Sequence, residues 1–531
     1  RWELQNRGHL FRTGKDFEVI LHLYEERGRR CLEKLRGPFA FALWDSKEKI
    51  LFLARDRFGI KPLYYTRTGS GALVFASEAK ALLKYPEVTA AVNSAALPHY
   101  LTFQYFPGPE SAFQGIFHLP PAHHLTWNGR ESRVRRYWEI RFRPRRKPLS
   151  YFIDKTEQLL KESVRLHSGE VGEAGAFLSS GVDSGLVAAL LRRRGPLHSF
   201  SVDCEGGKYD ELTPAKKTAR YLGSAHGETR IGPHEYWREL PRALRYQDEP
   251  VADPAAIALY FAASLAAEKV PAVFSGEGAD EIFGGYEIYR EPAAVAPLQH
   301  LPRPFKSALL RLANKMPEGL KGQSYLRRAT TSLEKRYYGN ALIFSEAEKK
   351  KLLNPETYPG GWQPPWEITA PYYQKSAGTD AAARMQHLDF HTWLPGDILA
   401  KADRMTGAHS LEVRLPYLDH LLVEHAATIP PSFKMAGGMT KYILRKAAAR
   451  HLPAEVSRRP KLGFPVPLAA WIREHYRESL DELWQCKAAQ LYFNPVFLRQ
   501  MLERHCRGQS DYARRIWAVA VFLLWHNLYM K

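Results

Sequence analysis

Residues 174–185 read Ala174-Gly-Ala-Phe-Leu-Ser-Ser-Gly-Val-Asp-Ser-Gly185, an apolar stretch followed by small polar residues. This pattern predicts a strand over 174–178, a tight turn, and a helix over 183–194. Where a strand meets a helix in this way, backbone N–H groups are unpaired and the helix N-terminus favours an anion. Small side chains let phosphate oxygens approach that backbone. The residues of the turn that would do so are Ser179, Ser180, Gly181 and Ser184.

Asp183 distinguishes this turn from the loop of P-loop proteins, in which Gly-Lys-Ser or Gly-Lys-Thr would follow. A carboxylate beside a phosphate cradle is repulsive unless a cation lies between them. Asp183 therefore implies Mg²⁺ that bridges to the phosphates. The alternative is purely structural, because Asp and Ser are also favoured as helix N-caps. The turn by itself does not separate these two interpretations.

A second loop follows the predicted strand 270–274 and reads Ser275-Gly-Glu-Gly-Ala-Asp-Glu-Ile-Phe-Gly-Gly-Tyr286. Its three carboxylates repel one another unless a metal or a cationic ligand joins them. Open α/β sheets bind ligands at the C-terminal ends of their parallel strands. We therefore predict that Asp280 completes a Mg²⁺ site with Asp183, and that Glu277 orients a nucleophile or receives its proton. An acidic surface turn is the alternative, which the strand context disfavours.

The chain divides into two parts at a basic linker. Residues 1–147 read as short strands and turns, which indicates a hairpin-rich α+β unit. Five of the seven residues from Arg141 to Lys147 are basic, and Pro144 lies among them. Over 148–531 strands alternate with helices, which are expected at 151–167, 183–194, 210–222 and 255–269, and this alternation predicts a mostly parallel sheet. After about residue 290 the pattern is helical, with proline-rich interruptions at 352–372.

Composition excludes several classes of protein. The 531 residues are 45% hydrophobic and 25% charged, which excludes disordered and fibrous chains. The 76 Lys and Arg against 56 Asp and Glu give +20, which admits nucleic acid, a membrane surface or ATP, although a solvated basic surface explains it as well. Four separated cysteines form no disulfide framework, and the twenty histidines show no HExxH-like ligand spacing. The apolar run 516–525 is too short to span a bilayer and predicts a buried helix.

Two long motifs carry a resemblance to a known family. Ser179–Ser184 resembles the pyrophosphatase loop of the N-type ATP pyrophosphatases, and Ser275–Tyr286 resembles a segment of the glutamine-hydrolysing asparagine synthetases. Further segments are similar to that family: Thr13–Asp16 with Glu18–Ile20, Gly37–Asp45, Arg55–Tyr64, Ser77–Lys80, Asp403–Met405, His409–Asp419, Lys441–Arg445 and Lys461–Pro465. They occur in the family's order over nearly the whole chain, which is identified as a member.

The resemblance implies two domains and one reaction. Residues 1–147 would be part of an Ntn-hydrolase glutaminase domain of αββα type, and residues 148–531 an ATP-pyrophosphatase synthetase domain. Aspartate would be activated by ATP as β-aspartyl-AMP with release of pyrophosphate. Ammonia, taken from glutamine in the complete protein, would then give asparagine. The implied roles are nucleotide contacts at Leu178, Val202, Ser275 and Gly276, Mg²⁺–pyrophosphate positions at Asp183 and Asp280, action on the acyl or amine partner by Glu277, and charge stabilisation by Lys441.

Two substitutions depart from the family's loop. Ser180 stands where Gly is commoner, and Gly185 stands where Ser is commoner. We expect the serine to be tolerated if its φ is negative. Relatives that close lactam rings tend to carry Tyr at the position of Glu277, so the glutamate favours amide formation with ammonia.

The family's glutaminase nucleophile is an N-terminal Cys whose own α-amino group is the base. Residue 1 here is Arg1, and Cys31 lies on a predicted helix, so no nucleophile is identified in this chain. Only Asp16 remains as a candidate ligand for the α-amino group of glutamine. We expect a fragment that lacks the first strands of the domain, because their loss would leave unpaired sheet edges. A truncated enzyme that uses free ammonia is the alternative.

Other functions stay open on the sequence. An amidotransferase of this fold could act on a polysaccharide or peptide carboxylate, a tRNA-modifying enzyme could share the ATP loop, and a scaffold without a nucleophile could bind RNA. The intact phosphate loop and carboxylates favour asparagine synthesis. We expect a cytoplasmic protein with ATP and Mg²⁺ as cofactors, small-molecule substrates, no membrane or nucleic-acid partner, and a possible homodimer. His123 and His124 are not expected to form a metal pair, and Tyr209–Glu211 is either a helix cap or part of the ATP site.

Overall fold

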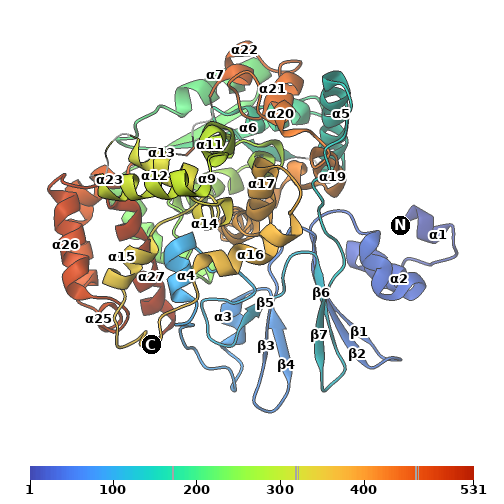
Figure 1. Cartoon of the computed structure of the whole chain (residues 1–531). Helices are drawn as coiled ribbons and strands as arrows, with labels where there is room; N and C mark the ends of the chain where they lie inside the picture. Colours follow the sequence, from blue (N-terminus) through green and yellow to red (C-terminus); the bar gives the residue numbers. More distant parts are fainter. Residues whose placement is uncertain (170–172, 317–319, 321, 461–462, 465, 531) are drawn as a thin grey trace.

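The computed structural model describes residues 1–169, 173–316, 320, 322–460, 463–464 and 466–530. The N-terminal part of the chain forms antiparallel sheets at one end of the molecule, and helices crowd around a parallel sheet in the remainder (Figure 1). The antiparallel strands are β1 (Ala40–Asp45), β2 (Ile50–Arg55), β3 (Tyr64–Arg67), β4 (Leu73–Ala76), β5 (Phe117–His118), β6 (His123–Trp127) and β7 (Ser132–Arg136).

These strands form a sheet of order β1-β2-β6-β7 and a second of order β4-β3-β5. Successive side chains of a strand point to opposite faces. Phe52 accordingly packs with Cys31 beneath α2 (Asp16–Arg27), whereas Leu53 packs with the second sheet. The layers are therefore helix, sheet and sheet. Cys31 is fully buried as expected, although its helix, Gly28–Glu33, is a 3₁₀ helix.

The parallel sheet carries the elements that matter for function. Its strands are β8 (Ala174–Phe177), β9 (His198–Cys204), β10 (Ala225–Ile231), β11 (Ala272–Phe274) and β12 (Glu412–Arg414). Their order is β10-β9-β8-β11-β12, and every neighbouring pair is parallel. The chain moves outward in one direction from β8 and in the other direction from β11. The switch point of this doubly wound sheet, where such folds bind ligands, lies between these two strands.

Helices predicted from the sequence lie where expected, within two or three residues. They are α5 (Leu149–Ser168), α6 (Val182–Arg192), α7 (Leu212–Leu222) and α9 (Ala255–Ala267). The other helices up to residue 290 are α1 (Trp2–Gln5), α3 (Ala79–Leu82), α4 (Leu97–Phe103), α8 (Pro233–Gln247), α10 (Ala279–Phe283) and the 3₁₀ helix Glu287–Arg290.

The region after residue 290 is helical as predicted, with two corrections. β12 is a strand of three residues, too short for its side chains to show a period. Helix α16 (Pro365–Lys375) begins in a segment that we expected to be a proline-rich interruption. Pro364 is the N-cap and Pro365 the first helical residue, where the missing N–H costs nothing, and Pro371 lies inside the helix.

The remaining helical elements of this region are α11 (Glu291–Gln299), α12 (Arg303–Lys315), α13 (Gln323–Thr330), α14 (Leu333–Arg336), α15 (Glu346–Leu352), α17 (Ala381–His391), the π-helix Leu394–Ile398, α18 (Leu399–Gly407), the 3₁₀ helix Pro416–Leu418, α19 (His420–Ala426), α20 (Pro431–Lys434), α21 (Tyr442–Ala448), α22 (Ala454–Arg458), α23 (Leu468–Trp471), the π-helix Ile472–Tyr476, α24 (Arg477–Leu483), α25 (Lys487–Tyr492), α26 (Pro495–Cys506) and α27 (Ala513–Tyr529). The predicted apolar run 516–525 lies inside α27 and is largely buried. Among the residues described, no helix is both long and apolar enough to cross a membrane.

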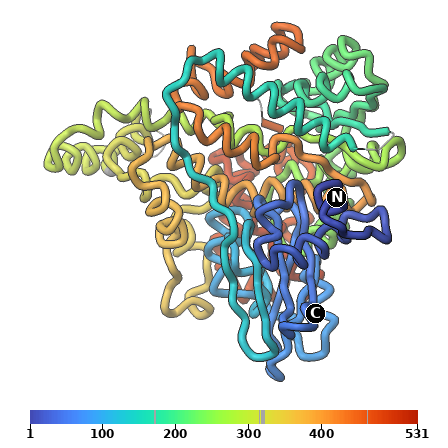
Figure 2. The backbone as a smooth tube through the Cα atoms, turned by 90° about the vertical axis from the view of Figure 1, so that its right-hand side faces the viewer, coloured from blue at the N-terminus to red at the C-terminus, as the bar shows by residue number. Residues whose placement is uncertain are grey.

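The basic linker runs in extended form along the side of the molecule from β7 to α5 (Figure 2). Its backbone is attached to the helical part, because Arg143 N donates to Ala427 O at 3.0 Å and Arg145 N donates to Thr428 O at 2.8 Å. All five of its basic side chains are exposed to solvent. This part of the positive charge is therefore a solvated surface.

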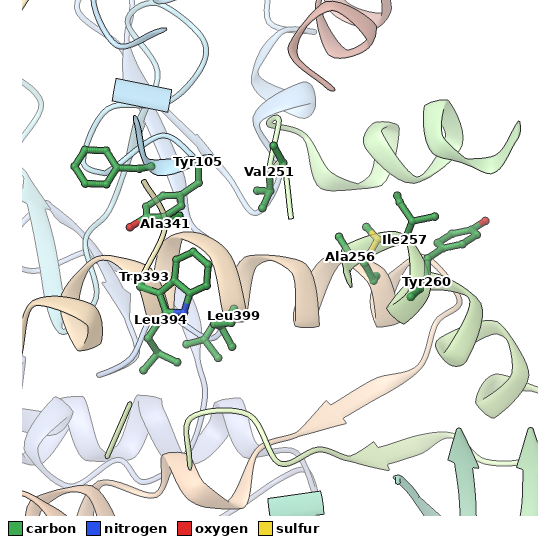
Figure 3. Packing of buried hydrophobic residues seen from close by; sticks show 14 of the residues in the cluster. Tyr105, Val251, Ala256, Ile257, Tyr260, Ala341, Trp393, Leu394 and Leu399 are labelled. Atoms are coloured by element: carbon green, nitrogen blue, oxygen red, sulfur yellow. The ribbon is translucent and has the colours of Figure 1, made fainter. Parts of the chain in front are cut away.

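An aromatic contact joins the two parts of the chain. The ring of Tyr105 lies 6.1 Å from that of Trp393, and both pack beside Leu394 and Leu399 (Figure 3). A Cβ on Gly396 would come within 2.4 Å of the Tyr105 ring. Glycine at that position is therefore what lets the ring lie against the backbone that leads into α18.

Candidate active site

The first loop presents an open helix end at the switch point. Gly181 is the N-cap residue of α6, and it provides no side-chain cap. Ser184 instead donates its hydroxyl to Gly181 O at 3.4 Å and accepts from Ser179 N at 3.1 Å. The side chain of Asp183 does not cap the helix. It contacts the ammonium group of Lys441 instead. The loop therefore has the arrangement of an anion site, not that of a capped surface helix.

The departures from the family's loop are accommodated. Ser180 is not among the residues with positive φ, so the condition for tolerating a serine there is met. Its backbone N–H donates to Glu211 Oε2 at 3.1 Å, which connects the loop to the start of α7. Asp210 accepts from Thr213 N at 3.0 Å, as a helix cap does. Gly185 faces Leu452, whose Cδ1 would lie 3.2 Å from a Cβ.

The second loop lies directly against the first. A Cβ on Gly276 would lie 3.0 Å from Asp183 Cβ and from Ser184 N, so only glycine allows the loops to approach this closely. Gly278 has a φ of +88°, and a Cβ there would meet Leu418 at 2.5 Å. The glycines of this motif thus serve close backbone packing and a left-handed turn.

Lys441 joins the two carboxylates that the sequence singled out. Its Nζ contacts Asp183 Oδ2, and it lies 2.6 Å from Asp280 Oδ1. The lysine side chain is 1% exposed and each carboxylate 13%. In a medium of low dielectric constant such a triad is strongly coupled, and the ammonium offsets the repulsion between the two acids.

The backbone of Lys441 is held in an unusual conformation. Its φ is +54°, which is costly for a residue with a Cβ. Arg445 fixes the neighbouring chain, donating from Nε to Thr440 O at 2.7 Å and from Nη1 to Ser457 O at 3.0 Å. The strained residue thus stands at the start of α21 with its side chain directed into the site.

The donor set suits a hard divalent cation. Within the described part of the chain, Asp183 Oδ1 is buried and has no hydrogen-bond partner. Asp280 presents its carboxylate to the same ammonium. Mg²⁺ prefers carboxylate oxygens together with substrate phosphates, so the two residues that the sequence proposed as ligands fit this ion.

Glu277 and Glu281 complete the acidic loop in different surroundings. Glu277 is half-buried. Glu281 is buried and accepts from Tyr286 OH at 2.7 Å. Burial and the neighbouring Asp280 carboxylate raise the pKa of Glu281 well above its usual range. Its backbone carbonyl accepts from Gln386 Nε2 at 2.8 Å. These contacts hold Glu281 within the fold.

The remaining predicted nucleotide contacts lie at the ends of β8, β9 and β11. Leu178 is buried, and its carbonyl accepts from the Ser201 hydroxyl on β9. Val202 is half-buried on the same strand. Ser275 is buried, and its N–H donates to Arg414 O at 3.0 Å. The structure therefore brings these residues and Gly276 to one edge of the sheet.

Some predicted residues lie elsewhere or outside the described chain. Asp16 is exposed in the first turn of α2, on the antiparallel part. His123 and His124 are adjacent on β6, so their side chains point to opposite faces of the strand. In Lys461–Pro465 the residues 461, 462 and 465 lie outside the described chain.

A buried polar network near Glu277 was not predicted. Lys401 Nζ contacts Asp253 and lies 3.1 Å from Asp397 Oδ1. Asp397 accepts from Gln104 Nε2 at 2.6 Å, and Gln104 in turn accepts from Arg514. Attraction to the two carboxylates outweighs burial and raises the pKa of Lys401, and Glu277 contributes to that rise. The network's members are more than a hundred residues apart in sequence, apart from Asp397 and Lys401, so no local pattern could have revealed it.

A cavity of 230 Å³ lies between the antiparallel part and the helical part. Two charged groups that line it bond across that boundary: Glu249 accepts from Tyr64 OH at 2.9 Å, and Arg404 donates to Ser77 O at 2.8 Å. Lining residues from the two parts include Arg55, Tyr64 and His118, and Val251, Leu399 and Arg404. The segment 248–253 thus forms part of the boundary.

Comparison with known proteins places this geometry in a family. The family described as asparagine synthase matches residues 155–527, and that described as glutamine amidotransferase domain matches residues 1–138. The chain is 39% identical over 530 residues to asparagine synthetase [glutamine-hydrolyzing] 1 of Bacillus subtilis, covering 99% of this chain and 83% of that protein. It is 40% identical over 547 residues to a putative asparagine synthetase [glutamine-hydrolyzing] of Mycobacterium tuberculosis, covering 99% and 81%.

A further Bacillus subtilis relative, asparagine synthetase [glutamine-hydrolyzing] 3, is 31% identical over 483 residues, covering 88% of this chain and 73% of that protein. The chain belongs to the asparagine synthase family and carries a glutamine amidotransferase domain at its N-terminal end.

Proposed function

We propose that this protein is an AMP-forming ligase that makes asparagine from aspartate, ATP and ammonia. One observation carries the proposal: Asp183, Asp280 and Lys441 converge between the ends of β8 and β11, beside an uncapped helix N-terminus. Relatives that match nearly the whole chain are named glutamine-hydrolysing asparagine synthetases. The ammonia would accordingly come from glutamine.

The reaction proceeds in two displacements. A β-carboxylate oxygen of aspartate attacks the α-phosphorus of ATP, and the bond to pyrophosphate breaks, giving β-aspartyl-AMP. The nitrogen of ammonia then attacks the acyl carbon, AMP leaves with the C–O bonding electrons, and the nitrogen loses a proton. Adenylation is needed because a carboxylate oxygen is a poor leaving group, whereas AMP is a good one.

The chain's own residues supply position and charge for these steps. The first-turn amides of α6 and the hydroxyls of Ser179 and Ser184 would bind the pyrophosphate oxygens. Lys441 supplies a buried positive charge at the same place. Asp183 and Asp280 would hold Mg²⁺, which when bound screens the charge that develops on pyrophosphate. Glu277 would orient the amine and accept its proton.

Three finer assignments belong to the same proposal. ATP would contact Leu178, Val202, Ser275 and Gly276. Asp16 would bind the α-amino group of glutamine in the amidotransferase domain. The two domains would comprise residues 1–147 and 148–531.

Product analysis tests the proposal directly. The protein is incubated with ATP, Mg²⁺, aspartate and ammonium, and AMP, pyrophosphate and asparagine are measured. Equal amounts of the three products are expected, and Asp183→Ala and Asp280→Ala should abolish AMP formation. Pyrophosphate release that requires a different carboxylate would instead support an amidotransferase of this fold with another acceptor. Salt-sensitive RNA binding without adenylation would support the scaffold alternative.

A further inference from the structure

Three metal-ligating side chains converge on α2, far in sequence from the loops of the parallel sheet. His9 precedes the helix, and His22 and Glu25 lie on it. The Nδ1 atoms of the two histidines are 3.1 Å apart. Glu25 Oε2 lies 3.0 Å from His22 Nδ1 and 3.6 Å from His9 Nδ1. Over the described ranges, this is the group of His, Cys, Asp and Glu atoms compact enough to surround one ion.

The protonation of the two imidazoles decides what fills this cluster. If His22 Nδ1 carries a proton, its N–H can be shared between Glu25 Oε2 at 3.0 Å and the lone pair of His9 Nδ1 at 3.1 Å. If both Nδ1 atoms are unprotonated, three acceptor atoms face one another, and a cation at the centre satisfies all three.

The other ring nitrogens prepare both histidines for that role. His9 Nε2 lies 3.3 Å from Glu26 Oε1, and Glu26 is itself held by Arg7 at 2.8 Å. His22 Nε2 is buried and lies 3.8 Å from Glu18 Oε1. A carboxylate opposite Nε2 favours the proton on that nitrogen, and the lone pair of each imidazole is then on Nδ1. Both lone pairs therefore belong to the two atoms that face each other.

The spacing matches tetrahedral coordination. Metal–ligand bonds of about 2.0–2.1 Å at the tetrahedral angle separate the ligand atoms by roughly 3.3–3.4 Å. The three distances here, 3.0, 3.1 and 3.6 Å, bracket that value. We propose that His9, His22 and Glu25 bind a divalent transition-metal ion of the zinc class, with water at the fourth position. Two imidazoles and one carboxylate are ligands that Zn²⁺ accepts readily.

The ion would fasten the segment before α2 to that helix. Glu18, which faces His22, also accepts from Thr13 N and the Thr13 hydroxyl, each at 2.7 Å. The site therefore braces the turn that leads to Asp16. Its ligands are 13 and 3 residues apart in sequence, a spacing that no common metal motif uses, and the sequence accordingly gave no signal.

Metal titration of the untagged chain tests the proposal without any nucleotide or amino-acid substrate, so its outcome is independent of the proposed ligase activity. Zn²⁺ is titrated by calorimetry and Co²⁺ by its visible absorption. We expect one equivalent of each to bind, with the absorption of tetrahedral Co²⁺. His9→Ala/His22→Ala should lose this binding, and Glu26→Gln should weaken it about 10–100-fold. His300→Ala removes an exposed imidazole elsewhere and should bind like the unchanged chain.

Circular dichroism of each variant establishes that it is folded. His9→Ala alone provides a second route, because His9 lies outside α2 and its loss leaves the helix intact. The proposal is overturned if the unchanged chain shows no stoichiometric tetrahedral Co²⁺ spectrum, or if that spectrum persists in either histidine variant.

Discussion

Gly285→Ala is expected to inactivate the ligase while leaving its fold nearly intact. A Cβ at this position would lie 1.9 Å from Asp280 Oδ1 and 2.1 Å from Lys441 Cε. Ordinary contact between such atoms is about 3.5 Å, so each group has to withdraw by roughly 1.5 Å. These are the carboxylate and the lysine that we place at the Mg²⁺–pyrophosphate position.

The structure separates the cost to stability from the cost to activity. The atoms that must yield are Asp280 Oδ1, Asp280 Cγ at 2.7 Å and Lys441 Cε, all of them side-chain atoms, and the φ of Gly285 is not positive, so no backbone strain is added. Overpacking of this kind costs about 1–3 kcal/mol. A misplacement of about 1 Å among reacting groups, in contrast, costs on the order of 10²-fold in rate. We therefore expect aspartate-dependent ATP–pyrophosphate exchange to fall at least about 10²-fold.

Exchange is measured with Mg²⁺ and aspartate, and stability by urea unfolding. Gly360→Ala is the matched control, because a Cβ there meets no atom within 4 Å and its φ is not positive either. Exchange by Gly285→Ala equal to that of the control would refute the placement of Asp280 and Lys441. A loss of stability above about 4 kcal/mol would show that the backbone, not the side chains, gives way.

Three further outcomes follow from buried charges. Lys441→Met removes the cation from beside Asp183, and pyrophosphate release should fall by at least about 10²-fold, whereas unchanged release would contradict the assigned role. Lys401→Met leaves two buried carboxylates unpaired and should lower the free energy of unfolding by about 3–5 kcal/mol in urea, against little change for the surface variant Lys161→Met. Burial raises the pKa of Asp389 from 3.8 to about 7, so the folded state holds a proton that the unfolded state has lost, and stability should decline as pH rises through this window. Asp389→Asn should flatten that decline and increase the free energy of unfolding at pH 8 by at most about 4 kcal/mol, measured by urea unfolding. If the stability of the variant fell more steeply with pH than that of the unchanged chain, the predicted direction of the effect would be wrong.

The sequence predicted most of the strand and helix pattern because the local signals were strong. Residues 174–194 combine an apolar strand, a small-residue turn and a helix in one uninterrupted pattern, and they fold so. The pattern was weak at β12, whose three residues acquire strand geometry only by pairing with β11. It was also weak at α16, where proline marks a helix start as readily as an interruption.

Residue types alone indicated what the two loops contain: a phosphate-sized turn with Asp183, and an acidic turn with Glu277 and Asp280. Chemistry requires those residues, and a short segment is enough to display them. The order of the strands is a different matter, because it depends on packing across the whole sheet. Only that order makes β8 and β11 neighbours and so brings the loops into contact.

Lys441 likewise separates what the sequence indicates from what the tertiary structure decides. Its position within a family-like segment suggested a role, but a lone lysine carries no local signal of burial. Its place between Asp183 and Asp280 depends on a positive φ, on the contacts of Arg445, and on the absence of a side chain at Gly285. The zinc-class cluster on α2 is likewise invisible to spacing. The sequence by itself determined which chemical groups are available, and tertiary structure decided which of them meet, because distances between remote segments are set by packing and not by local propensity.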